Sequence, residues 1–179
     1  ADCAPVHLVG HSLGGAVALA LADIRPRAIA TLTLIAPAGL GPEIDGEVLA
    51  GLGRARRAAS LAPWLRRMVG DGALISDDYA RAAMRGRAGA ELRAVQADMA
   101  EALFPDGVQG FSLAAALDRL ETPARVIWGR RDRIIPWRHA LECPGRVGLH
   151  LMAGIGHMPH LEAPEAVAEI LRQQIAGAR

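Results

Sequence analysis

Short apolar runs recur along the chain and predict four strands. Within each run apolar residues follow one another with little alternation, which is typical of strands buried on both faces of a parallel sheet. The predicted strands cover residues 6–10, 29–35, 125–129 and 147–152. A segment rich in alanine and leucine, residues 12–24, predicts a helix between the first two strands. We therefore expect a right-handed strand–helix–strand unit at the start of the chain.

The hydrophobic pattern changes between residues 41 and 110. Strand-forming residues are scarce there, and alanine and arginine are frequent. The pattern predicts helices over residues 47–60, 63–69, 76–84 and 89–103. Ser76, followed by Asp77 and Asp78, is a favourable helix start because its hydroxyl can accept from a free backbone N–H. Pro63 is expected to stand at the beginning of the second of these helices.

Together these patterns predict an α/β fold in two parts. Residues 1–40 and 111–179 would form a core, a parallel sheet flanked by helices. Residues 41–110 would form a helical cap inserted into that core. Helical patterns over 112–120 and 164–176 supply further helices for the faces of the sheet.

Composition narrows the function classes. The 179 residues suit one domain, and a formal net charge of +1 argues against nucleic-acid binding. No apolar run approaches the roughly 18 residues that a membrane span needs. Cys3 and Cys143 lack the spacing of a zinc site or a disulfide framework, so we expect no metal and a reducing, cytoplasmic setting. Arginines cluster in the predicted cap and are interpreted as a solvated helix face; they are Arg54, Arg56, Arg57, Arg66 and Arg67.

The first predicted strand runs into the sequence Gly10-His11-Ser12-Leu13-Gly14. A Gly-x-Ser-x-Gly turn between a strand and a helix is typical of a nucleophile elbow, whose central residue has a strained backbone. Positions 10 and 14, occupied by Gly10 and Gly14, are expected to require a small residue so that the strand and the helix can pass close to each other. The alternative is an ordinary serine in a glycine-rich turn.

Two further residues follow predicted strands. Asp132 comes after the third strand and His157 after the fourth, as Ser12 comes after the first. Parallel strands bring their carboxyl ends to one edge of the sheet, so the three side chains should meet there. Serine needs an imidazole to take its proton and a carboxylate to orient that imidazole. Alternatively, Asp132 pairs with neighbouring arginines, or His160 takes the place of His157.

These segments resemble the motifs of the α/β-hydrolase fold family. The similarity is to the C-terminal part of that fold and rests on the elbow, on Trp128–Pro136 and on Gly156–Pro159. Within the family, Leu34–Ile44 together with Ala102–Pro105 is similar to the hydrolase-like domain of the dihydrolipoamide acetyltransferase component of acetoin dehydrogenase complexes.

The resemblance implies a serine enzyme that acts on a small ester, thioester or other acyl substrate. Ser12 would be the nucleophile, His157 the base and Asp132 its orienting carboxylate, with the Leu13 N–H as one oxyanion donor. The family has further strands and a His-Gly loop ahead of the elbow strand, and that loop gives the second donor. This chain reaches the elbow within ten residues. We therefore expect it to be part of a larger protein and weakly active at best.

Two other functions remain open. One is an acyltransferase component of an acetoin or 2-oxo-acid dehydrogenase complex, in which a lipoyl group would sit on a separate upstream domain and no cofactor on this chain. The other is a non-catalytic hydrolase-fold fragment. The expected partners are a small acyl substrate and dehydrogenase-complex subunits, with neither nucleic acid nor membrane. The exposed edge of strand 6–10 is expected to pair with a second copy or with a preceding segment.

Overall fold

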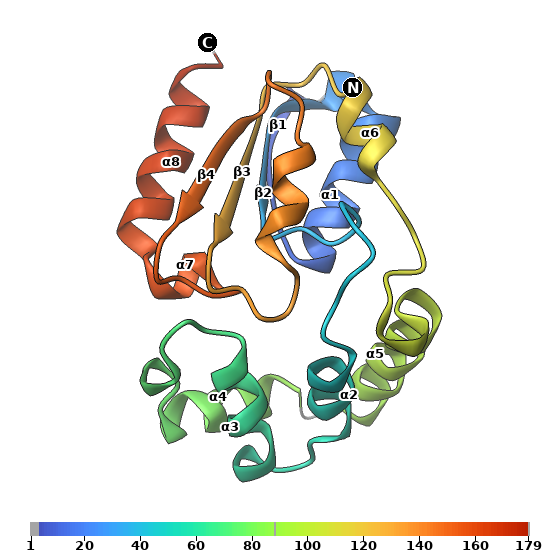
Figure 1. Cartoon of the computed structure of the whole chain (residues 1–179), viewed down its shortest axis with the longest axis vertical. Coiled ribbons are helices and arrows are strands. Elements are labelled where there is room, and N and C mark those ends of the chain that lie inside the picture. The colour runs from blue at the N-terminus through green and yellow to red at the C-terminus, as the bar shows by residue number, and fades with distance from the viewer. Residues whose placement is uncertain (1–3, 88, 179) are drawn as a thin grey trace.

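A four-stranded parallel sheet forms the centre of the molecule (Figure 1). The computed structural model describes residues 4–87 and 89–178, so Cys3 lies outside the described residues. The strands lie in the order β1-β2-β3-β4, and every neighbouring pair is parallel. Their bounds are β1 Val6–His11, β2 Ile29–Ile35, β3 Ala124–Gly129 and β4 Gly148–Met152. The predicted α/β class with a parallel sheet is confirmed.

Helices cover both faces of this sheet. Leu32 and Leu34 of β2 belong to the core cluster that α1 and α6 cover. Ile35 of the same strand packs in a second cluster with Val167 of α8. The bounds are α1 Leu13–Ile24, α6 Ala114–Arg119, α7 Pro159–Glu162 and α8 Pro164–Ala176. Within the described residues, none of the helices is both long enough and apolar enough to cross a membrane.

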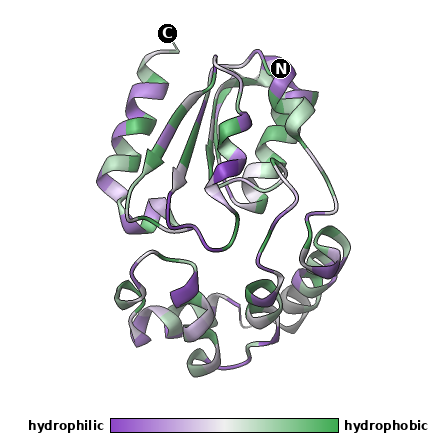
Figure 2. Cartoon of the chain, viewed as in Figure 1, coloured by the Kyte–Doolittle hydropathy of each residue, from purple (hydrophilic) through white to green (hydrophobic). Residues whose placement is uncertain are grey.

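Four more helices lie beyond the carboxyl ends of the strands (Figure 1). They are α2 Gly46–Arg54, α3 Ala58–Arg67, α4 Asp77–Gly86 and α5 Ala90–Leu103, called the cap helices below. Hydrophobic and hydrophilic residues mix along them, as expected for helices with one buried face (Figure 2). A small apolar cluster that includes Leu61, Leu65 and Ile75 belongs to them. The division into a core and a separate cap unit stays a prediction.

Two helix boundaries predicted for the cap are wrong. The helix expected over residues 47–60 ends at Arg54, and the next begins at Ala58 rather than at Pro63. The break falls at residues 55–57 because Arg57 adopts an extended conformation, and its carbonyl accepts from the Ser60 hydroxyl at 2.9 Å. Pro63 then lies inside α3, where packing of the helix outweighs the missing N–H.

The helix start predicted at Ser76 is confirmed, because Ser76 Oγ accepts from the Tyr79 N–H at 3.1 Å. Members of the predicted arginine cluster make solvated ion pairs. Arg66 lies 3.2 Å from Asp77, and Arg67 binds Asp45 at 2.6 Å. Both arginine side chains are 40% or more exposed, so these pairs contribute little to stability.

β1 lies at one end of the strand order and pairs only with β2 among the described residues. Val6 and Val9 on this strand are 49% and 45% exposed. Val17 and Ile24 of the adjoining α1 are also exposed. An apolar edge strand beside an apolar helix surface can accept another strand. The pairing expected at this edge stays a prediction.

Candidate active site

Ser12 stands at a strained turn between β1 and α1. Its backbone has φ 53° and ψ −123°, a conformation that residues other than glycine rarely adopt. The Ser12 N–H donates to the Ile35 carbonyl at 2.9 Å, and the Ala38 N–H donates to the Ser12 carbonyl at 3.0 Å. Gly15 and Ala16 also donate to that carbonyl. The end of β2 and the first turn of α1 therefore hold the strain in place, and the hydroxyl is presented at the strand end.

The close approach of strand and helix falls on Gly10 and Gly15. A Cβ on Gly10 would lie 2.4 Å from the Gly14 carbonyl oxygen, and one on Gly15 would lie 2.9 Å from Pro37 Cβ. A Cβ on Gly14 would meet no atom within 4 Å. The expectation that Gly14 must be small is therefore wrong. The missing side chain of Gly14 points into open space, whereas Gly15 packs against the turn after β2.

The structure brings together the three side chains predicted from the sequence. His157 Nε2 lies 3.0 Å from Ser12 Oγ, and His157 Nδ1 lies 2.7 Å from Asp132 Oδ2. The side chains of His157 and Asp132 are 1% and 0% exposed. Because the carboxylate accepts from Nδ1–H, Nε2 is left to accept from the Ser12 hydroxyl. The alternative histidine, His160, packs against the ring of His11 at a centroid distance of 4.6 Å.

Four donors surround the carboxylate of Asp132. The backbone N–H groups of Ile134 and Ile135 donate to Oδ1 at 2.8 and 3.0 Å. The Trp128 indole N–H donates to Oδ2 at 2.9 Å, beside His157. Among the described residues no arginine forms an ion pair with Asp132, so the alternative of a surface ion pair is wrong. Sequence reasoning missed Trp128, although a tryptophan at the strand end before the Asp132 loop could have indicated it.

The loop that carries His157 is bonded to the cap. The His157 N–H donates to the Met68 carbonyl at 2.7 Å. The Glu162 carboxylate accepts from the N–H groups of Gly156 at 2.9 Å, Met158 at 3.2 Å and Gly70 at 2.7 Å. Glu162 therefore joins both sides of the His157 loop to the segment after α3. Nothing in the local sequence pattern indicated this role.

His11, the residue before Ser12, is a neutral donor. Its Nε2 lies 2.7 Å from the His157 carbonyl, which can only accept, so Nε2 carries the proton. Burial and, to a smaller extent, the neighbouring His157 lower the pKa of His11 to about 3, although the hydrogen bond to the His157 carbonyl and the Asp132 charge oppose this shift. The imidazole thus supports the backbone of the His157 loop without a charge.

We expect the fold to lose stability as pH falls below 6.5 because of His11. The unfolded chain binds a proton at His11 near pH 6.5, whereas the folded chain does so only near pH 3. This contribution is complete above pH 6.5 and is lost as the pH falls toward 3. Between pH 7.0 and 5.5 the free energy of unfolding should fall by about 1 kcal/mol through this group.

Urea denaturation at these two pH values measures the effect, with His11→Gln as the comparison. His150 and His160 also have lowered pKa values, mainly from burial, and so add a loss in both proteins. The loss should be smaller in His11→Gln than in the wild type. Equal losses would show that His11 is not the cause.

A cavity of about 540 Å³ lies over Ser12, within the size range of ligand sites. Ser12 and Leu13 form its floor. Its walls are mainly apolar side chains of the cap, including Leu52, Leu61, Leu65, Met68, Met99 and Phe104. Leu13 is the first residue of α1, so its N–H has no acceptor within the helix. Its role as an oxyanion donor stays a prediction.

Comparison with known proteins places the chain. The sequence profile described as the alpha/beta hydrolase family matches residues 1–170. The chain belongs to this family. Among solved structures, the meta-cleavage product hydrolase from Pseudomonas fluorescens superposes with a TM-score of 0.85 at 20% identity, covering 98% of this chain and 66% of that one. This similarity shows that the two share the alpha/beta hydrolase fold.

Curated relatives of this hydrolase-family chain include an acetoin-system component and a hydrolase. It is 35% identical over 166 residues to the "Dihydrolipoyllysine-residue acetyltransferase component of acetoin cleaving system" of Pseudomonas putida, covering 93% of this chain and 44% of the relative. It is 28% identical over 179 residues to a 2-hydroxymuconate semialdehyde hydrolase of the same organism, covering 96% and 62%. The chain spans about half the length of these relatives. The resemblance to the acetoin-system component is confirmed.

Proposed function

We propose that this chain carries the nucleophile, base and orienting acid of a serine enzyme that acts on a small ester, thioester or related acyl compound. The observation that carries the proposal is the continuous hydrogen-bonded series from Ser12 Oγ through His157 to Asp132. Two of its three members are almost fully buried. The strained backbone of Ser12 and the cavity above it support the same conclusion.

In the proposed reaction each residue has a step. His157 Nε2 takes the hydroxyl proton as Ser12 Oγ attacks the acyl carbon, and Asp132 stabilises the resulting imidazolium. The Leu13 N–H donates to the oxygen that becomes negative. When the tetrahedral intermediate collapses, His157 returns its proton to the leaving alcohol or thiol. Ser12 then holds the acyl group as an ester until an acceptor, activated by His157, removes it.

Two candidate reactions differ in the molecule that takes the acyl group from Ser12. Water gives a hydrolase, as in the name of the 2-hydroxymuconate semialdehyde relative. A thiol gives an acyltransferase, and the name of the acetoin-system relative favours this second candidate. A lipoyl group on a separate domain would then be the acyl acceptor, and this chain itself would need no cofactor. As the partners we propose a small acyl substrate and, for the transferase, subunits of a dehydrogenase complex in the cytoplasm.

We also propose that the β1 edge pairs with a strand from the rest of a longer protein or from a second copy. The exposed Val6 and Val9 of β1 support this pairing. A segment beside β1 would be well placed to supply the second oxyanion donor. Losing one such donor typically lowers kcat about 10²–10³-fold. The chain alone should therefore be a slow enzyme.

A fluorophosphonate probe tests the proposed nucleophile. We expect the probe to attach to Ser12, as mapped by peptide mass spectrometry, because His157 activates its hydroxyl. Ser12→Ala should take up no label, and His157→Ala should react about 10³-fold more slowly. Ser60→Ala is the control, since the Ser60 hydroxyl lies on an exposed helix start in the cap.

Failure of Ser12 to react in a protein that circular dichroism shows to be folded would contradict the proposal.

The rate at which the acyl-enzyme releases its acyl group distinguishes water from a thiol as the acceptor. Release that dihydrolipoamide accelerates would favour the transferase, and release at the same rate with and without it would favour the hydrolase.

A further inference from the structure

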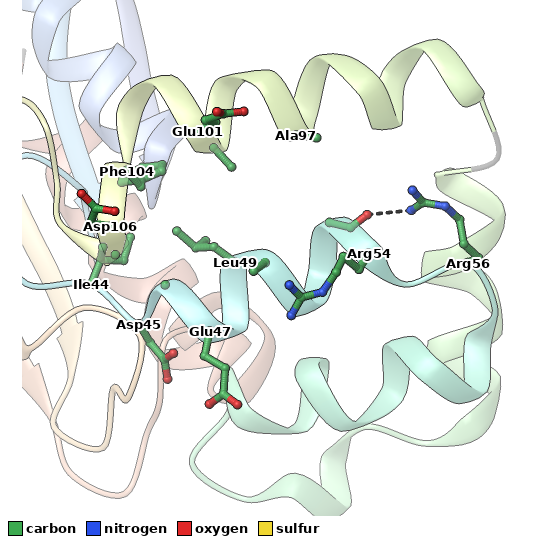
Figure 3. Close-up of a pocket in the computed structure, with 15 residues that line it drawn as sticks. Ile44, Asp45, Glu47, Leu49, Arg54, Arg56, Ala97, Glu101, Phe104 and Asp106 are labelled. Atoms are coloured by element: carbon green, nitrogen blue, oxygen red, sulfur yellow. Dashed lines mark hydrogen bonds between the residues drawn. The ribbon is translucent and has the colours of Figure 1, made fainter.

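A second cavity adjoins the one over Ser12. It has a volume of about 730 Å³ and lies between α2 and α5 (Figure 3). The two cavities share five lining residues, which are Ile44, Leu49, Gly53, Ala100 and Phe104. Shared walls over two facing helices place the cavities end to end. A path from Ser12 to the outer side of the cap through both cavities would pass these shared residues.

The path is apolar inside and charged at its outer end. Figure 3 shows Leu49 on the side of α2 that faces α5, with Phe104 at the end of α5. The carboxylate of Glu47 points away from this space. Arg54 and Glu101 line the outer cavity but do not line the inner one. Apart from Arg87, a molecule that extends from Ser12 would therefore meet charged lining residues only in the outer cavity.

The inner cavity contains one charged lining residue, Arg87, among the described residues. Its guanidinium donates to the Leu52 carbonyl at 2.8 Å and lies 3.4 Å from Gln96 Oε1. Both partners, Leu52 and Gln96, also line the inner cavity, so these contacts hold the guanidinium at its wall. Most of the other residues that line the inner cavity are leucine, isoleucine, methionine, valine, alanine or phenylalanine. Such a wall binds methylene groups and gives a two-carbon acyl group little to contact.

We propose that this path binds an elongated apolar acyl chain, which runs from Ser12 past Leu49 and Phe104 and emerges between α2 and α5. The inference rests on the proposed function, because it places the acyl carbon at Ser12. It assigns the substrate class as esters or thioesters of medium-length acyl chains, in preference to acetyl compounds. A polar group at the far end of the chain would reach the charged outer end.

Gly53 offers a direct test because it lines both cavities and a Cβ there would meet no atom within 4 Å. Gly53→Phe should place a ring in the path without a clash in α2. Gly86→Phe is the matched control, since Gly86 also lies in the last turn of a cap helix, has open space around it and lines neither cavity. Ala97→Phe narrows the path from α5 and serves as a second variant if Gly53→Phe fails to fold.

The assay compares kcat/KM for p-nitrophenyl decanoate and p-nitrophenyl acetate. We expect the wild type to prefer decanoate, and Gly53→Phe to lower the decanoate-to-acetate ratio by at least about tenfold, because a ring would displace several methylenes. Gly86→Phe should leave the ratio within about twofold of the wild-type value. A wild-type preference for acetate, or equal changes in both glycine variants, would overturn the proposal.

A binding measurement separates this inference from the proposed function. Decanoate is titrated by calorimetry into Ser12→Ala, with and without Gly53→Phe. Binding that Gly53→Phe weakens by about tenfold supports the path even if no ester is turned over. Absence of turnover together with such binding would contradict only the proposed function. Decanoate affinity that neither Gly53→Phe nor Ala97→Phe changes would overturn the path.

Discussion

Replacement of Asp132 with asparagine is expected to lower kcat on the order of 10⁴-fold. The asparagine Oδ1 would keep accepting from the Ile134 and Ile135 N–H groups, so its amide nitrogen would face Trp128 and His157. That nitrogen can only donate, so His157 Nδ1 would have to accept, and the proton would move to Nε2. Nε2 could then no longer take the proton of Ser12.

The measurement is kcat with a p-nitrophenyl ester, in proteins whose folding is checked by circular dichroism. Asp118→Asn is the matched control because Asp118 is exposed on α6, which lies away from the carboxyl ends of the strands (Figure 1). It should leave kcat within about twofold of the wild type. A loss below tenfold in Asp132→Asn would show that the tautomer of His157 does not limit the reaction.

The second large effect concerns stability and compares two glycines of the elbow. Gly10→Ala should lower the free energy of unfolding by about 3 kcal/mol, because its Cβ would lie 2.4 Å from the Gly14 carbonyl oxygen and 2.8 Å from Ala18 Cβ. Gly14→Ala should leave it unchanged or raise it by up to about 0.5 kcal/mol, because a helical alanine there meets open space.

Thermal unfolding followed by circular dichroism resolves this difference. At about 2–4 °C per kcal/mol for a chain of this size, Gly10→Ala should melt roughly 6–12 °C lower than Gly14→Ala. Similar melting temperatures for the two variants would mean that the elbow relaxes around a new side chain. The close approach of β1 and α1 would then not be what requires glycine at position 10.

The sheet and the three central side chains could be predicted because both follow from local rules. Apolar runs mark buried strands, and parallel strands deliver the residues after their ends to one edge. Ser12, Asp132 and His157 each follow a strand directly or within a few residues. Their meeting point therefore depended only on the parallel arrangement of the strands, which the long insertion between β2 and β3 does not change.

The features that sequence missed depend on distances between segments far apart in the chain. Gly15, and not Gly14, is the crowded position because of Pro37 in the turn after β2. Glu162 acts on Gly70, which lies 92 residues away. Pro63 suggested a helix start, but the surrounding cluster keeps it inside α3. Such contacts join residues that are far apart in the sequence, so no local pattern predicts them.

Hydrogen bonds join the His157 loop to Met68 and Gly70, which follow α3. They distinguish the α3 side of the cap from the α5 side. A rigid opening of the α3 side would pull on the His157 N–H and on Glu162, and so would misalign the base. The α5 side carries no such bonds among the described residues. If the proposed function holds, substitutions on α5 should change the acyl preference and leave the contacts among Ser12, His157 and Asp132 in place. The α3 side would keep His157 in place, and the sequence of α5 could change without moving it.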